Sequence, residues 1–194
     1  MTHMATHVAL LRGINVGGKN KVAMADLREV VAEFGHADVS TYIQSGNVLF
    51  SSDPGDADTS ALAAALAAAI TARLGVNAPV VVMSRDELAA AIAANPFPDE
   101  ADPRRVHAVL LSGAPAAEAA GKIDAALERS TAKGSRDELA IVGRTLYLHT
   151  PDGFGNSELA AAVLRILTSP RAGVTGTARN WATMLKLLDL CGDR

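Results

Sequence analysis

The residues best suited to chemistry lie in a glycine-rich, basic segment near the start of the chain, LLRGINVGGKNK. Gly13, Gly18 and Lys19 have the spacing G-x-x-x-x-G-K, which is typical of loops that hold nucleotide phosphates. Asn20 stands where such a loop needs Ser or Thr to hold a magnesium ion. The segment therefore predicts an anion-binding site, but it lacks the magnesium ligand that a nucleotide-hydrolysing loop requires.

A loop of this composition can surround an anion with backbone N–H donors. Arg12 would add a fork-shaped guanidinium group, and Lys19 and Lys21 would add point charges. Phosphate or carboxylate is the expected guest. In the alternative interpretation, Gly13, Gly17 and Gly18 only permit positive φ in a long connection and the lysines are solvated.

Hydrophobic periodicity predicts the elements that position this segment, in the order βαββαβ. The expected strands are 7–12, 39–44, 47–51 and 79–83, with a tight turn at Ser45-Gly46; the expected helices are 24–34 and 60–74, the second capped by Thr59 or Ser60.

The same order then recurs. Ser84 and Glu87 form a capping box that opens a connecting helix, which Asn95-Pro96 stops. The second set comprises strands 106–111, 139–142, 145–149 and 174–178, helices 116–129 and 157–167, and a C-terminal helix led by Trp181.

The repeat predicts an α+β fold of two ferredoxin-like βαββαβ units, each an antiparallel sheet with helices on one face. We expect the first unit at 1–83, a linking helix and loop at 84–104, and the second unit with the C-terminal helix at 105–194. The competing architecture is one continuous α/β sheet with several crossovers.

This topology predicts which segments meet. The end of the first strand, the turn between the second and third, and the entry to the fourth share one edge of the sheet, so the basic loop should lie beside the 44–47 turn. The predicted ligand-binding residues are Arg12, Gly13, Asn15, Gly17, Gly18, Lys19, Lys21, Gln44, Ser45 and Asn47, with Arg179 and Asn180 from the second half. No catalytic residue is assigned.

Arg179 and Asn180 belong to a second candidate pocket. The segments around 95–97, 150–156 and 177–181 should be neighbours at the opposite edge of the second sheet. Asp152, Asn156, Arg179 and Asn180 would line this pocket over Phe97, Phe154 and Trp181. The alternative interpretation is turn chemistry and helix caps above core aromatics.

Composition excludes several classes of protein. With 194 residues, a net charge of -3 and one cysteine, Cys191, the chain is predicted to be a cytoplasmic globular protein without a disulfide or a membrane span. The five histidines lack metal-ligand spacing, so neither a metal nor another cofactor is expected. Ser45 lacks the frame of a nucleophilic serine. Phe50 is the one ring on the expected central strands, which disfavours RNA stacking on the sheet.

Five blocks of the sequence carry a family resemblance: LLRGINVGGKNKVAM, TYIQSGNVLF, ANPF, YLHTPDGFGNSEL and TARNWATMLKL. In this order, from about Val8 to Leu188, the chain resembles the bacterial domain-of-unknown-function family 1697. The resemblance supports the fold and implies no activity. The chain departs from the family pattern at Ala23, where Pro is usual, and at Glu158, where Lys is usual.

The leading hypothesis is an anion-binding protein, with enzymatic activity and oligomeric state left open. Its partner would be a nucleotide or another anionic small molecule, with nucleic acid as a further candidate. The rival hypothesis is a scaffold without a small-molecule site. Exposure of Arg12 and Asn15 in an open cleft would favour binding, whereas burial with every donor satisfied by protein would favour the scaffold.

Overall fold

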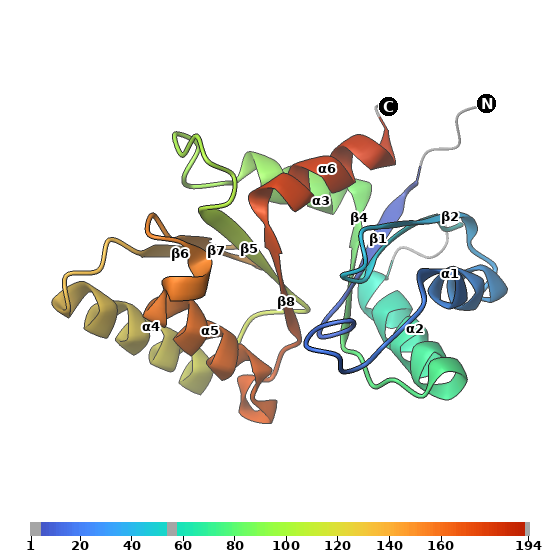
Figure 1. Ribbon diagram of the computed structural model, residues 1–194, viewed down its shortest axis with the longest axis horizontal. Coiled ribbons are helices and arrows are strands. Elements are labelled where there is room, and N and C mark those ends of the chain that lie inside the picture. The colour runs from blue at the N-terminus through green and yellow to red at the C-terminus, as the bar shows by residue number, and fades with distance from the viewer. Residues whose placement is uncertain (1–4, 54–57, 193–194) are drawn as a thin grey trace. The chain divides into compact units, whose positions relative to one another are not determined.

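The computed structural model describes residues 5–53 and 58–192, and it contains two four-stranded antiparallel sheets (Figure 1). The strand orders are β2-β3-β1-β4 and β6-β7-β5-β8. The first strand of each half therefore lies inside its sheet, between the third and fourth strands of that half. This confirms the predicted α+β class and excludes a single continuous parallel sheet.

The elements of the first half follow the expected order. They are β1 (His7–Leu11), α1 (Met24–Glu33), β2 (Ala37–Tyr42), β3 (Asn47–Ser51), α2 (Thr59–Leu74) and β4 (Val80–Ser84), followed by the connecting helix α3 (Arg85–Ala93).

The second half repeats this order with two short 3-10 turns added. It consists of β5 (Val106–Leu111), α4 (Ala117–Ala132), β6 (Glu138–Val142), β7 (Thr145–His149), η1 (Phe154–Asn156), α5 (Glu158–Thr168), η2 (Pro170–Ala172), β8 (Gly176–Asn180) and α6 (Trp181–Cys191).

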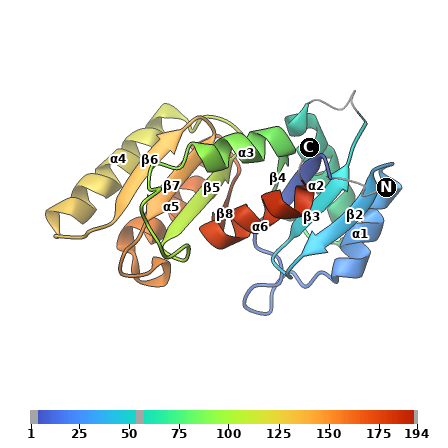
Figure 2. The same cartoon turned by 90° about the horizontal axis from the view of Figure 1, so that it is seen from above.

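In each half two helices cover one face of the sheet (Figures 1 and 2). Leu27 of α1 and Leu66 of α2 pack with Phe50 of β3, and all three are at most 1% exposed. In the second half Ile123 of α4 and Val163 of α5 occupy the equivalent core. Burying such a side chain contributes roughly 1.5–3 kcal/mol, so these two cores are the main source of stability.

Backbone contacts divide the chain into two compact units. One contains the described residues up to Ala90 together with those from Leu185 onward, and the other is Ala91–Met184. Within the first unit, Arg85 Nε donates to the carbonyl oxygen of Gly192 at 2.9 Å. This bond ties the start of α3 to the end of α6.

Helix starts follow capping chemistry with one correction. The Ser84 and Glu87 capping box is present, with Ser84 N–H donating to Glu87 Oε2 and Glu87 N–H donating to Ser84 Oγ. Helix α2 is capped by Asp58, not by Thr59 or Ser60 as expected, because the Asp58 carboxylate accepts from the N–H groups at 60 and 61. The described helices include none that is long and apolar enough to span a bilayer.

Strands β1, β4 and β6 differ from their predicted bounds by one residue, and β2 and β8 differ by two. Strand β2 begins at Ala37, before an irregularity near Asp38 (φ 54°), and ends at Tyr42 because Ile43 takes a positive φ of 49°. The connection to β3 is consequently a four-residue turn, 43–46. Strand β8 lies two residues later than expected because its polar end pairs with β5 up to Asn180. Hydrophobic periodicity does not detect a strand end made of polar residues.

The turn before β3 depends on Gly46. Its φ is +81°, and a Cβ added there would lie 2.7 Å from Leu11 Cβ. We expect Gly46→Ala to lower the free energy of unfolding by about 2–4 kcal/mol, because alanine would be strained in the left-handed conformation and its Cβ would also clash with Leu11. Gly35→Ala is the control, since Gly35 has a similar φ of +86° but open space around it and should cost about 1 kcal/mol. Equal losses in urea unfolding would rule out the close approach to Leu11.

Candidate functional site

The basic loop and the 43–46 turn meet at one edge of the first sheet, as the topology predicts. Leu11 N–H donates to the Gly46 carbonyl at 2.8 Å, and Arg12 N–H donates to the Pro79 carbonyl at 2.9 Å. Asn15 Nδ2 reaches the Gln44 carbonyl at 3.0 Å. The end of β1, the β2–β3 turn and the entry to β4 are therefore joined by hydrogen bonds.

The loop itself is a small hairpin. Asn15 N–H donates to the Asn20 carbonyl at 3.0 Å, and Lys19 N–H donates to the Val16 carbonyl at 3.1 Å. Gly17 and Gly18 have φ values of 58° and 76°, the pair of positive angles that defines a type I′ turn. The glycines thus have a structural reason to be present: they close the hairpin.

Asparagine side chains hold the hairpin to the sheet edge. Asn15 Nδ2 donates to the carbonyls of Val22 and Gln44, and Asn15 Oδ1 accepts from Val22 N–H at 2.9 Å. Asn20 Nδ2 donates to the Gly13 carbonyl at 3.0 Å. These carboxamides are engaged by the protein, which assigns Asn15 and Asn20 a structural role.

Asn47 has the same role in the facing turn. Its side chain is fully buried, and Nδ2 donates to the Tyr42 carbonyl at 3.0 Å and to Ser45 Oγ at 2.9 Å. These bonds span the turn and hold Ile43 in its positive-φ conformation. A β-branched residue rarely adopts this region, and here its side chain is 52% exposed.

The cationic groups of the hairpin differ in their surroundings. Lys19 and Lys21 are exposed and, among the residues that the structure describes, have no acidic partner. Arg12 is half-buried, and desolvation lowers its pKa below the ordinary value. Within the described chain, no protein acceptor receives the N–H groups of Gly17 and Gly18 at the tip.

At the opposite edge of the second sheet, the predicted segments 150–156 and 177–181 both contact residues 103–105, which lead into β5, whereas residues 95–97 were expected there. Thr150 N–H donates to the Arg105 carbonyl at 2.8 Å, and Trp181 N–H donates to the Pro103 carbonyl at 3.2 Å. The polar side chains there have local partners. Arg179 is buried and donates to Thr177 Oγ1 and the Ala178 carbonyl.

Asn180 caps α6 by accepting from Thr183 N–H. Asp152 forms an ion pair with Arg136, and Asn156 Nδ2 donates to the Asp152 carbonyl. These contacts match the alternative of turn chemistry and caps for the second candidate pocket. The aromatic rings stack on histidines, Phe97 on His149 and Phe154 on His107.

Comparison with known proteins identifies the family of the chain and agrees with its fold. The family model described as protein of unknown function (DUF1697) matches residues 4–147. The chain belongs to this family. A solved structure, that of the conserved bacterial protein SP0830 from Streptococcus pneumoniae, matches with a TM-score of 0.62 and 24% identity over 97% of this chain and 99% of the other. That likeness supports the fold alone. No curated protein matches the chain.

In this DUF1697 protein a histidine lies between two carboxylates. His149 Nε2 is 2.8 Å from Glu100 Oε2, and its Nδ1 is 3.1 Å from Glu138 Oε1. Burial alone would lower the pKa of His149, but the two hydrogen bonds and their charges outweigh it, and the pKa is raised. The carboxylates contact opposite nitrogens, and no group of three metal-ligating side chains gathers in the described residues.

His107 has the opposite environment. It stacks on Phe154 with ring centroids 3.7 Å apart, its Nδ1 has no hydrogen-bond partner, and burial lowers its pKa to about 4. Sequence spacing gave no sign of either histidine environment. His149 meets Glu138 across the β6–β7 pair and Glu100 from the segment before β5, and His107 of β5 meets Phe154 from the segment after β7.

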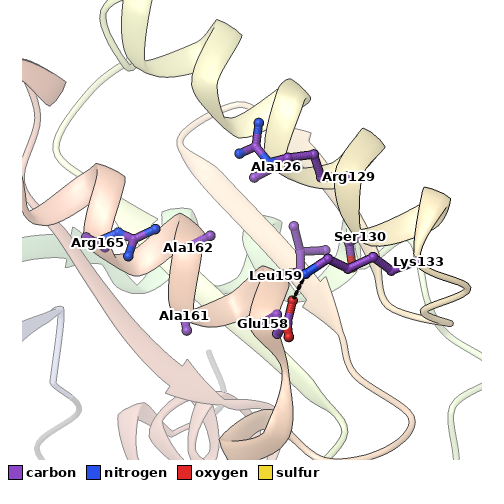
Figure 3. A pocket seen from close by; sticks show the side chains of 9 residues that line it. All are labelled: Ala126, Arg129, Ser130, Lys133, Glu158, Leu159, Ala161, Ala162 and Arg165. Atoms are coloured by element: carbon purple, nitrogen blue, oxygen red, sulfur yellow. Dashed lines mark hydrogen bonds and ion pairs between the residues drawn. The ribbon is translucent and has the colours of Figure 1, made fainter.

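Sequence reasoning also missed a groove between α4 and α5 (Figure 3). It has a volume of about 340 Å³ and is lined by residues from the facing sides of the two helices: Ala126, Arg129, Ser130, Lys133, Glu158, Leu159, Ala161, Ala162 and Arg165. The four-residue spacing of Arg129 and Lys133 puts both on one face of α4, but only helix packing shows that Arg165 faces them.

The role of Asn15 can be tested by truncation. Asn15→Ala removes three hydrogen bonds and leaves Val22 N–H without its acceptor, so we expect the free energy of unfolding to fall by about 2–3 kcal/mol. Asn20→Ala is the matched control: it also has positive φ but its side chain makes one hydrogen bond, and about 1 kcal/mol should be lost. Denaturant unfolding measures both, and equal losses would refute the anchoring role.

The pKa values of the two histidines should be shifted in opposite directions from the ordinary value. By NMR, His149 should have a pKa above about 6.5 and His107 one of about 4. Because the folded pKa of His149 is raised, its contribution to stability is present below about pH 6.5 and is lost as pH rises through the folded value. For His107, whose neutral form is favoured on folding, stability is lost as pH falls from about 6.5 towards 4.

Glu100→Gln separates the causes of the His149 shift. Burial lowers the pKa of His149, and the Glu100 carboxylate is one of the two groups that raise it. Without this carboxylate the pKa of His149 should fall, while that of His107 stays near 4. An unchanged His149 pKa in Glu100→Gln would contradict the contact between the two side chains.

Proposed function

We propose that the 12–22 hairpin and the 43–46 turn bind the phosphate backbone of a nucleic acid. The observation that carries the proposal is the pair of exposed lysines, Lys19 and Lys21, without acidic partners in the described chain, on a hairpin anchored by hydrogen bonds of Asn15. A rigid cationic element loses little conformational entropy when it meets phosphates.

The form of the hairpin favours an extended ligand over a small one. The segment projects from the edge of the first sheet between β1 and α1 (Figures 1 and 2). Small molecules are usually enclosed in concave sites, whereas this hairpin is a projecting segment. A phosphate backbone, in contrast, can be contacted by projecting lysines.

Further groups of the same edge fit this ligand. The tip N–H groups of Gly17 and Gly18 can donate to phosphate oxygens, and Arg12 adds a partly desolvated guanidinium group. Gln44 is exposed beside them. The net charge of -3 means that binding depends on this local patch, and we expect steep salt dependence.

A second candidate function is a protein contact at the same hairpin. Val16 at the tip is 65% exposed and Ile43 in the facing turn is 52% exposed, so an apolar partner surface could cover both. This candidate depends on apolar contact, whereas nucleic-acid binding depends on charge. Replacement of the lysines therefore discriminates between them.

The proposal is tested by fluorescence anisotropy with labelled single-stranded and duplex oligonucleotides over a series of salt concentrations. Lys19→Ala combined with Lys21→Ala should weaken binding about tenfold or more and reduce the salt slope by roughly one to two. Thermal unfolding should be unchanged, because both side chains are exposed. Arg73→Ala is the control, since it removes an exposed cation of the same unit that is already paired with Glu33.

Three outcomes would overturn the assignment. Oligonucleotide binding that is unchanged in the double variant would place the contact elsewhere. Binding of mononucleotides but not of oligonucleotides, lost in the same variant, would replace the polymer by a small ligand. Loss of protein capture in Val16→Ser without any effect of the lysines would favour the protein contact.

A further inference from the structure

The groove between α4 and α5 is a second concentration of cationic groups, and it lies wholly within the second unit. Small side chains, Ala126 and Ala162 among them, leave room between the helices, and Leu159 supplies an apolar part of the lining. Its volume of about 340 Å³ falls in the range of small-ligand sites.

The lining charges are unbalanced. Three cations, Arg129, Lys133 and Arg165, stand against one carboxylate, that of Glu158. Glu158 is already engaged: Lys133 Nζ lies 2.6 Å from its Oε2, and this ion pair lowers the pKa of Glu158. In the described chain no acidic side chain pairs with Arg129 or Arg165. Figure 3 shows these two arginines on facing helices and the ion pair towards the other end of the groove.

We propose that this groove binds a compact anion with two or more negative charges, held between the guanidinium groups of Arg129 and Arg165. Guanidinium forks match the oxygens of phosphate and carboxylate groups, and one fork from each helix would place donors on two sides of the ligand. Neither the hairpin of the first unit nor any nucleic-acid ligand is involved in this site.

The Lys133–Glu158 ion pair limits the size of the ligand. Both residues also line an adjoining hollow of about 380 Å³ that continues towards Asp137 and Asp152. A long polyanion that followed the groove would therefore meet the Glu158 carboxylate and then further acidic side chains. A compact ligand beside Arg129 and Arg165 avoids them.

The test uses the full chain and two probes, inorganic pyrophosphate and citrate, in isothermal titration at physiological and high salt. We expect saturable binding of one probe at a single site, and the probe that binds identifies phosphate or carboxylate as the preferred group. Arg129→Ala and Arg165→Ala should each weaken binding about tenfold or more. Arg104→Ala, an exposed arginine of the same unit outside the groove, should have no effect.

Glu158→Gln gives the sharpest discrimination, because it should tighten binding by about two- to fivefold. It removes the one lining carboxylate and leaves Lys133 available to the ligand. A variant that merely damaged the fold would weaken binding, so a gain has no structural explanation. Thermal unfolding of each variant verifies that the second unit is intact.

Absence of binding by either probe would overturn the proposal, and so would binding that persists in the Arg129→Ala, Arg165→Ala double variant. Binding that Glu158→Gln weakens in a folded protein would contradict the electrostatic argument. Lys19→Ala should leave probe binding unchanged, so failure at this groove and failure at the hairpin are observed separately.

Discussion

The central position of β1 in its sheet, and of β5 in the other, decides which loops can meet. Each is paired on both sides with antiparallel strands, β1 with β3 and β4, and β5 with β7 and β8. The segment that leaves β1 must therefore emerge beside the turn that enters β3 and the connection that enters β4. The hydrogen bonds from Leu11 to Gly46 and from Arg12 to Pro79 follow directly from that arrangement.

This constraint explains why topology could be predicted from periodicity although side-chain roles could not. Alternating and four-residue apolar spacing is set by burial, so the pattern located the strand 47–51 and the helix 116–129, in which Phe50 and Ile123 are buried. Strand ends are set instead by backbone conformation. Ile43 ends β2 through a positive φ that its residue type does not announce, and the buried Asn47 compensates with bonds across the turn.

The glycine-rich loop shows how similar sequences can solve different physical problems. Glycines followed by lysine suggest phosphate recognition, yet here Gly17 and Gly18 satisfy the angles of a two-residue turn. Asn15, which was predicted to bind a ligand, bonds to the backbone of its own loop, and Asn20 does the same. The loop exposes fewer ligand-binding groups to solvent than the motif implied. They are the two lysine side chains and two backbone N–H groups at the tip, together with an exposed valine.

The α4–α5 groove could not have been found from sequence because its charge balance is a tertiary property. Arg129 and Arg165 are 36 residues apart, and each alone reads as an ordinary solvated helix residue. Their significance depends on which cation forms the ion pair with Glu158. The single acidic group that could neutralise an arginine is instead paired with Lys133. Because Glu158 is paired with Lys133, the groove keeps a net positive charge beside Arg129 and Arg165. Both arginines are exposed, so salt screens that charge and binding of an anion should weaken as the salt concentration rises.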